Sequence, residues 1–239
     1  MVSLARSRRS APRSWPRRIF GWVIRIVIGF VLLSILMTLI YRFVPPPITL
    51  TQLGELSQGH SVARDWMPIS QMDPDMARAA IAAEDGNFCK HHGFDFTAIQ
   101  KALAGNGAGK RYRGGSTISQ QTAKNVFLWQ GRSWLRKGLE AYFTSLIELG
   151  WGKQRIIEVY LNVAETGIGT YGANAGAMRY FHHDASHLTP TEAARIAAIL
   201  PLPKKREAVD PGGFVRRYGN NIAARMPKMQ RAGFYSCLK

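Results

Sequence analysis

The longest apolar stretch of the chain covers residues 19–44 and is interrupted by only two arginines. Residues 26–41 within it carry no charge, and about 20 predominantly apolar residues are enough for a helix to cross a bilayer. Trp22 and Tyr41 stand where aromatic side chains anchor a span at the membrane interfaces. Because a buried helix of a small domain would be shorter, the pattern predicts a transmembrane helix over residues 19–44.

The charges around this stretch predict its orientation. Residues 1–18 hold six arginines and no acidic residue, and such a basic flank stays on the cytoplasmic side of a membrane. Everything after the three prolines at 45–47 is then expected on the outer side, with residues 45–64 as a linker. No small-residue cleavage site follows the apolar run, which favours a retained signal-anchor over a removed signal peptide.

Beyond the linker, the spacing of apolar residues is helical. Residues 73–75 (Asp-Pro-Asp) supply an N-cap, a proline at the first helical position and a first-turn acid. The alanine-rich residues 76–83 that follow are predicted to form a helix. Glu84 and Asp85 would then lie at its end.

The same reasoning predicts further helices over residues 118–128, 153–163 and 189–201. The first of these follows an expected glycine-rich, basic loop over residues 105–115, with Ser116 or Thr117 as its N-cap. The last begins with a capping box formed by Thr189 and Glu192.

A helix that starts near Arg136 has two distinct faces. Its apolar residues recur at helical spacing, whereas Glu140, Thr144 and Glu148 stand at positions i, i+4 and i+8. These three side chains therefore share a polar stripe along one side of the helix.

The rest of the chain adds no other type of element. Residues 167–176 form a glycine-rich connection, and there is no convincing run of alternating strands and no internal repeat. We predict a mainly α-helical domain over residues 65–211, with the weakly patterned residues 212–239 as a C-terminal extension of the same domain.

The charge of the chain narrows the class of partner. It has 32 Lys and Arg residues against 15 acidic residues, and removing the eight arginines before Val44 still leaves +9. Such a surplus is typical of proteins that bind nucleic acid, anionic lipid or a phosphorylated substrate. Because the domain is expected outside the cytoplasm, we exclude nucleic acid and expect lipid headgroups or a pyrophosphate-linked substrate.

Cysteine and histidine are too sparse to predict a zinc site or a disulfide framework. The cysteines are Cys89 and Cys237, and the sequence leaves open whether they pair. His182, His183 and His187 lack an accompanying cluster of acids or cysteines, which favours a surface turn over a metal site.

A first candidate block combines Glu84 and Asp85 with Phe88, His91 and Gly93. A glycosyl transfer needs a carboxylate that removes the proton of the attacking hydroxyl, and a neighbouring acid plus an apolar ring can raise its pKa toward the working pH. Taken alone, the block is equally consistent with a solvated acidic helix end on which Phe88 packs.

A second block covers residues 114–125, Gly-Gly-Ser-Thr-Ile-Ser-Gln-Gln-Thr-Ala-Lys-Asn. Its glycines let the backbone approach a ligand, and the N-terminus of the following helix offers N–H groups to an anion. Lys124 lies one turn from Gln121 and can hold a phosphate as a point charge. Solvated surface residues are the alternative, but two adjacent glutamines after a glycine loop favour a functional site.

A third block places the cations Arg132, Arg136 and Lys137 around Glu140. Arg136 and Glu140 are four residues apart, so that pair alone is most simply a surface ion pair. The additional cations favour a site for a pyrophosphate leaving group, where negative charge develops on the departing oxygen.

With a fourth block at residues 153–162 (Lys-x-Arg-Ile-Ile-Glu-x-Tyr-Leu-Asn), the chain resembles the peptidoglycan glycosyltransferases of glycosyltransferase family 51. The resemblance covers roughly residues 68–211 and is closest to the monofunctional biosynthetic transglycosylases. Thr122 stands where a leucine is common in that family. The resemblance implies a lysozyme-like helical domain with a small membrane-proximal lobe.

The resemblance also implies a reaction, the polymerisation of lipid II. Glu84 would deprotonate the 4-hydroxyl of the incoming GlcNAc, which attacks C1 of the donor MurNAc. The product would be a β-1,4-linked glycan strand, formed with inversion at C1 and release of undecaprenyl pyrophosphate. Glu140 would assist at the second site.

The remaining site residues follow from the same resemblance. Lys124, Arg132, Arg136 and, where one binds, a divalent cation would neutralise the pyrophosphate, and no cofactor is otherwise implied. The residues implied to bind substrate or to shape its loop are Asp85, Phe88, His91, Gly115, Ser116, Thr117, Gln120, Gln121, Asn125 and Lys137. Glu148 and Glu158 are expected to pair with cations between helices.

The implied setting is the cytoplasmic (inner) membrane, crossed once, with a periplasmic catalytic domain. Its partners would be lipid II, the undecaprenyl-pyrophosphate-linked strand and membrane lipids, and cell-wall synthesis or division proteins are further candidates. Trp129 and Trp134 suit a segment that dips into the lipid interface as well as they suit a core.

Two other classes of protein share parts of this pattern. A muramidase-like hydrolase would not need the cations of residues 124–137, and a membrane-tethered scaffold would not need Glu84 and Glu140. A transpeptidase domain would need S-x-x-K, S-x-N and K-T-G motifs. Residues 236–239 match the first of these by letters only, so we predict a polymerase without transpeptidase activity.

Overall fold

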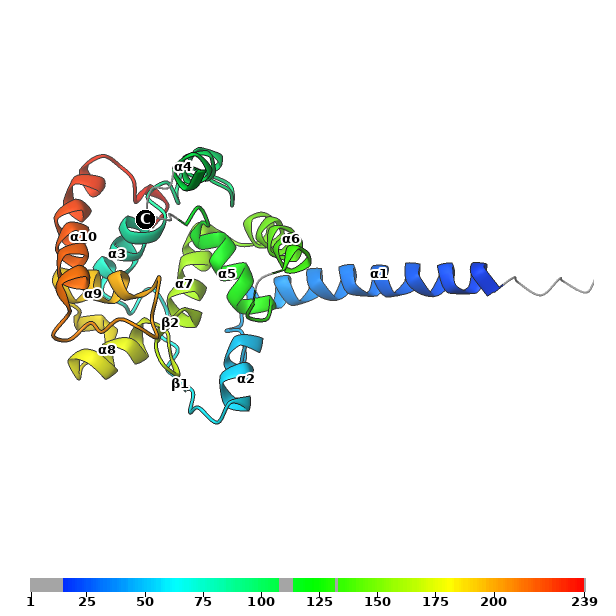
Figure 1. The fold of residues 1–239 in the computed structure, drawn as a ribbon, viewed down its shortest axis with the longest axis horizontal. Helices are drawn as coiled ribbons and strands as arrows, with labels where there is room; N and C mark the ends of the chain where they lie inside the picture. Colours follow the sequence, from blue (N-terminus) through cyan, green and yellow to red (C-terminus); the bar gives the residue numbers. More distant parts are fainter. Residues whose placement is uncertain (1–14, 108–113, 132, 239) are drawn as a thin grey trace, which may run out of the picture.

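The computed structural model describes residues 15–107, 114–131 and 133–238, and one long helix projects from a helical domain (Figure 1). The helices are α1 (Trp15–Tyr41), α2 (Leu50–Ser57), α3 (Pro74–Glu84), α4 (Phe96–Gly107), α5 (Ile118–Phe127), α6 (Trp134–Gly150), α7 (Lys153–Val163), α8 (Ala173–Phe181), α9 (Pro190–Ile199) and α10 (Gly213–Arg231), with 3-10 turns η1 (Ala185–His187) and η2 (Ser236–Leu238). The prediction of a mainly α-helical fold is confirmed.

A small sheet lies beside these helices. It consists of β1 (Ala63–Arg64), β2 (Glu165–Gly167) and β3 (Thr170–Tyr171), in the order β1-β3-β2. β1 runs parallel to β3 and β2 antiparallel to it. The predicted glycine-rich connection at 167–176 therefore contains a strand and the start of α8. Strands of two or three residues are too short to show an alternating pattern in a sequence.

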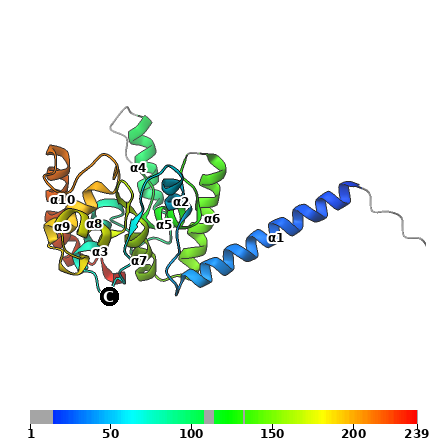
Figure 2. The same ribbon diagram turned by 90° about the horizontal axis from the view of Figure 1, so that it is seen from below.

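The α1 helix is about 40 Å long, and its N-terminal part projects from the domain (Figure 1). It is long and apolar enough to cross a membrane, in agreement with the span predicted over residues 19–44. Its end nearest the domain packs on α6 (Figure 2). Ser34 Oγ lies 2.6 Å from the Tyr142 hydroxyl, and Trp151 Nε1 donates to the carbonyl of Thr38 at 2.7 Å. This end of α1 is thus part of the packed domain.

Part of the predicted linker is helical. Thr49 and Gln52 form a capping box that starts α2, a local signal of the T-x-x-Q type. Glu55 of α2 is buried and pairs with both His60 and Lys204. These contacts attach α2 to the loop that follows α9.

The half of the domain farthest from α1 is built from α3, α9 and α10. Asp73 caps α3 and Pro74 occupies its first turn, as predicted. Alanines of α3 and α9 are buried, and such small side chains let the two helix axes approach closely. The weakly patterned residues after 211 form α10, which packs on both helices through buried residues such as Ile222 and Met226.

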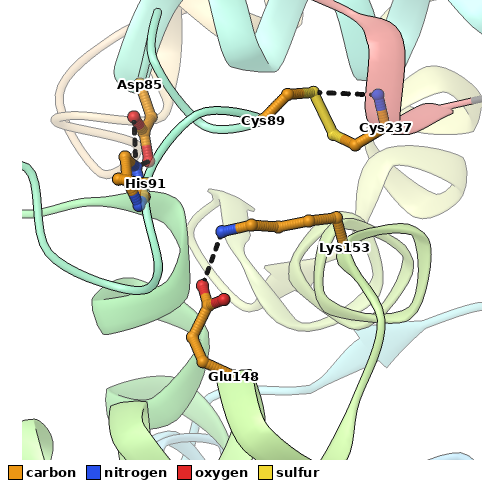
Figure 3. Close-up of a disulfide and its surroundings, with 6 residues drawn as sticks. All are labelled: Asp85, Cys89, His91, Glu148, Lys153 and Cys237. Atoms are coloured by element: carbon orange, nitrogen blue, oxygen red, sulfur yellow. Dashed lines mark hydrogen bonds and ion pairs between the residues drawn. A yellow bond between two sulfur atoms is a disulfide. The ribbon is translucent and has the colours of Figure 1, made fainter.

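The half nearest α1 contains α5, α6 and α7. The polar stripe of α6 is turned toward the interior of the domain, because Glu140 and Thr144 are buried. Glu148 accepts hydrogen bonds from Ser119 of α5 and, at 2.7 Å, from Lys153 of α7 (Figure 3). The expectation that Glu148 pairs with a cation between helices is confirmed.

Cys89 and Cys237 form a disulfide, which settles the pairing that the sequence left open. It joins the loop between α3 and α4 to η2 near the end of the chain (Figure 3).

Gly93 ends the same loop at a point where α6 comes close. Its φ is +91°, and a Cβ there would lie 2.9 Å from Thr144 Cγ2 and 3.0 Å from Glu148 Cγ. The Gly93 carbonyl accepts a hydrogen bond from Thr117 Oγ1 at 2.6 Å. A residue without Cβ is therefore required here, since the backbone is left-handed and the space is filled.

We expect Gly93→Ala to lower the free energy of unfolding by about 2–4 kcal/mol, because it adds both backbone strain and a clash. The measurement is chemical unfolding of the full chain in detergent, followed by circular dichroism. Gly138→Ala is the matched control, because a Cβ there meets nothing within 4 Å. Gly138 lies inside α6, so its replacement should stabilise by about 0.5–1 kcal/mol. Equal effects of the two changes would contradict this account.

Candidate active site

Glu84 is the last residue of α3, and its carboxylate is held from α5. Gln121 Nε2 donates to Glu84 Oε2 at 2.9 Å. The hydroxyl of Tyr160 on α7 in turn donates to Gln121 Oε1 at 3.4 Å. Three helices thus fix the position of one carboxylate.

The surroundings of this carboxylate favour its protonated form. Burial raises the pKa of Glu84 above its ordinary value, and the charge of Asp85 raises the pKa further. The hydrogen bond from Gln121 and the charges of Arg206 and Lys124 oppose this rise in pKa. The expected rise in the pKa of Glu84 caused by Asp85 is confirmed, but burial raises this pKa more than Asp85 does.

Asp85 is buried and binds other groups of the protein. It is only 6% exposed, and both of its oxygens lie 3.0 Å from His91 Nε2 (Figure 3). Its Oδ2 also accepts the backbone N–H of Ile118 at 2.9 Å. The N-terminus of α5 was expected to attract an anion, and Asp85 supplies one from within the chain.

His91 has a defined tautomer in this arrangement. The backbone N–H of Gly93 donates to His91 Nδ1 at 3.2 Å, so in the neutral ring the proton is on Nε2 and points to Asp85. Phe88 is fully buried beneath it, with the rings edge to face at 6.3 Å. Lys153 Nζ lies 4.5 Å from the centre of the Phe88 ring. Asp85, Phe88 and His91 form one supporting unit beside Glu84.

The second block, residues 114–125, contains buried residues that hold the start of α5 and others that are exposed. Thr117 and Gln120 are buried and form a capping box at the start of α5. Gly115 lies close to α4, where an added Cβ would be 3.4 Å from Ile99 and from Ala102. Ser116 is exposed and Asn125 partly exposed. Of the two predicted candidates for the N-cap of α5, Ser116 and Thr117, the structure confirms Thr117.

Glu140 on α6 is held by two cations of its own helix. Arg136 Nη1 donates to Glu140 Oε2 at 3.0 Å, and Lys137 Nζ donates to Oε1. Arg136 and Glu140 are both buried, unlike the surface pair that the spacing alone suggests. Arg136 Nε is buried and has no hydrogen-bond partner among the described residues. The site therefore holds an unused donor beside a neutralised carboxylate.

Lys124 connects the two carboxylates electrostatically. Burial lowers the pKa of Lys124, and the charges of Arg136 and Lys137 lower it further. The charges of Glu140 and Glu84 raise this pKa. Lys124 is therefore coupled electrostatically to both carboxylates. Arg132 lies outside the described residues.

Two residues near Glu84 were not predicted. Tyr218 on α10 donates its hydroxyl to the carbonyl of Ala83 at 2.9 Å, and burial raises its pKa, with the charge of Glu84 adding to the rise. Arg206, in the loop between α9 and α10, is among the cations that lower the pKa of Glu84. The available signal was the basic run at 204–206, which lies far from the other blocks in the sequence.

Large apolar residues at the start of α6 and in the segment before it are exposed. Trp134 is 93% exposed, Leu135 71% and Trp129 43%, so a core position is excluded for Trp134. Phe127 instead points inward and stacks on Phe143 with ring centres 4.4 Å apart.

The histidines after α8 pair locally. His183 Nε2 lies 3.3 Å from Glu192, and His187 Nδ1 lies 3.1 Å from Asp184. Within the part of the chain that the structure describes, no group of three or more histidine, cysteine or acidic residues could hold a metal ion.

Comparison with known proteins identifies the same region. The Transglycosylase family model matches residues 50–227. A biosynthetic peptidoglycan transglycosylase of Caulobacter vibrioides is 50% identical over 200 residues, which cover 84% of this chain and 87% of the relative. Relatives of the same description from Xanthomonas campestris pv. campestris and Bdellovibrio bacteriovorus are 48% and 44% identical, over 217 and 229 residues. These cover 88% of both chains for Xanthomonas and 91% of both for Bdellovibrio.

The matched range includes Glu84, Lys124 and Glu140 and every helix from α2 to α9. Because the family model covers well over half of the chain and the relatives align over most of it, the chain belongs to the transglycosylase family.

Proposed function

We propose that this chain is a peptidoglycan glycosyltransferase that polymerises lipid II into β-1,4-linked GlcNAc-MurNAc strands, without transpeptidase activity. One observation carries the proposal: the desolvated carboxylate of Glu84 feels the charge of Lys124, which in turn feels the charges of the buried pair Arg136 and Glu140. Such a pairing provides a base for a hydroxyl and a counter-charge for a pyrophosphate in one site.

In this proposal Glu84 is the general base. The 4-hydroxyl of the incoming GlcNAc gives its proton to the Glu84 oxygen that does not bind Gln121, while the hydroxyl oxygen bonds to C1 of the donor MurNAc. The bond from C1 to the pyrophosphate oxygen breaks on the opposite face, so C1 is inverted. The raised pKa of Glu84 suits this role, because a stronger base takes a hydroxyl proton more readily.

The cations stabilise the leaving undecaprenyl pyrophosphate. Arg136 uses Nη1 for Glu140, and we assign to a phosphate oxygen its buried Nε–H, which has no partner among the described residues. Lys124 and Lys137 add positive charge on the same side. We assign Glu140 the task of orienting these cations, since two of them already occupy its oxygens. Ser116, Gln121 and Asn125 then line the approach to the sugars.

The membrane setting is part of the same proposal. A disulfide persists in oxidising compartments and is rare in the cytosol, so the Cys89–Cys237 bond supports a periplasmic domain anchored in the inner membrane with its N-terminus inside. The exposed Trp134, Leu135 and Leu149 lie on α6, the helix that packs on α1, where lipid is expected. We retain residues 65–211 as the catalytic core and 212–239 as its extension.

We expect Glu84→Gln to abolish polymer formation from lipid II, because the amide keeps the shape of the side chain but cannot accept the hydroxyl proton. The measurement is gel separation of glycan strands made by the purified full chain. Unchanged polymerisation would remove Glu84 as the base. Sugar fragments released from finished wall, with no polymer from lipid II, would indicate a hydrolase instead.

The pH dependence of kcat/KM should report the raised pKa of Glu84. The base must be ionised to act, so activity should rise with pH through a value above that of an ordinary glutamate. Gln121→Met removes a hydrogen bond that lowers this pKa, so the acidic limb should move to higher pH. Gln230→Met, on the exposed side of α10, is the control and should leave the limb in place. No movement in the Gln121 variant would contradict the assignment.

Arg136→Lys should lower kcat/KM by about 10–1000-fold, because lysine keeps the charge but loses the forked donors. Arg216→Lys on α10 replaces an exposed arginine and should change kcat/KM by less than about twofold. Equal activities of the two variants would show that charge alone is needed at residue 136.

A further inference from the structure

The Cys89–Cys237 disulfide ties the end of the chain to the loop that carries the first block. Cys89 follows Phe88 directly and stands two residues before His91. Its partner belongs to η2, and the two cysteines are 148 residues apart in the sequence. A cross-link over so long a separation strongly restricts the unfolded chain, but its position beside Phe88 and His91 suggests a local effect as well.

The C-terminal segment, residues 232–238, is docked on this loop by further contacts. The backbone N–H of Cys237 donates to Cys89 Sγ at 3.3 Å. Lys90 Nζ lies 3.7 Å from the centre of the Phe234 ring. Tyr235 is buried, and η2 packs on α7.

Packing alone holds this segment incompletely. A cavity of about 490 Å³ is lined by Tyr235, Ser236 and Leu238 of the C-terminal segment. Its other walls include Ile69 and Ala77. A cavity lacks the contacts that a filled core provides, so the C-terminal segment is loosely packed on this side, and the disulfide is its covalent connection to the loop.

The opposite side of the loop is held by the supporting unit of the active site. Asp85 binds His91 and the first N–H of α5, and α5 carries Gln121, which holds Glu84. The loop is therefore fixed from two sides, by Asp85 on one and by Cys89 on the other (Figure 3). A change at the disulfide can reach Glu84 through His91, Asp85 and α5.

We propose that Cys89 and Cys237 are positioning residues for the transfer reaction: the disulfide holds the loop so that the His91–Asp85 pair keeps α5, and with it Gln121, in register with Glu84. The cysteines do not touch substrate in this proposal. It rests on the proposed function for its catalytic consequence, but the tethering of the loop can be measured without activity.

The bond can be opened in the intact protein. A dithiol such as dithiothreitol supplies two electrons and two protons, which convert the disulfide into two thiols while the reagent becomes a cyclic disulfide. The double variant Cys89→Ala/Cys237→Ala lacks the bond permanently and leaves no free thiol.

The test compares the oxidised full chain, the reduced full chain and the double variant in detergent with lipid II. We expect reduction and the double variant each to lower kcat by about 10-fold with KM changed less than about twofold, since misplaced catalytic groups slow the chemical step. Dithiothreitol should not change the double variant further. Ser236→Ala, in the same turn, is the control and should keep the oxidised activity. Equal kcat in all three forms, with reduction verified by thiol titration, would overturn the proposal.

Hydrogen exchange provides the readout that is independent of activity. On reduction, amides of residues 86–93 should exchange faster, whereas those of α8 should not change. Unchanged exchange in the loop, or equal acceleration in α8, would overturn the positioning role, the second because it indicates general destabilisation. Faster exchange in the loop together with no polymer from the oxidised protein would support the tether and reject the proposed function.

Discussion

The carboxylate of Asp85 is buried where α3 ends and α5 begins, and it accepts hydrogen bonds from both sides. A buried carboxylate without partners would cost several kcal/mol, so this one stabilises the fold only while His91 and the α5 N-terminus stay in place. Glu84 precedes it in the chain, and Gln121 lies one turn into α5. The position of the proposed base thus depends on a contact made by its neighbour.

The α6 helix connects this arrangement to the apolar N-terminal helix. One side of α6 carries Arg136 and Glu140 toward the site, and residues nearer its C-terminus contact α1. The same helix also presents Trp134 and Leu135 to the outside. A lipid-linked pyrophosphate would have its tail in the membrane and its charge at the cations, so one helix that contacts both regions suits such a substrate.

The sequence predicted best what depends on neighbours within one helical turn. The caps at Asp73, Thr117 and Thr189 and the bounds of α7 agree with the structure, because caps and apolar periodicity are local. The helix α10 was missed although its apolar residues recur at helical spacing, because Gly219 and Pro227 inside it argue against a long helix. The small sheet was missed because its strands have only two or three residues and because β1 pairs with β3 from a distant part of the chain.

For the candidate site too, the sequence predicted some features and the tertiary structure decided others. The residue types of the blocks at Glu84, Lys124 and Glu140 by themselves indicated an acid/base group near an anion site, and the resemblance of these blocks to a known family indicated a transferase. Only the tertiary structure decided that Asp85 accepts a hydrogen bond from the start of α5, that Arg136 is buried with Nε unpaired among the described residues, and that Cys89 pairs with Cys237. It also brought Arg206 and Tyr218 to Glu84. Those outcomes depend on burial and on contacts between distant segments, which no local pattern specifies.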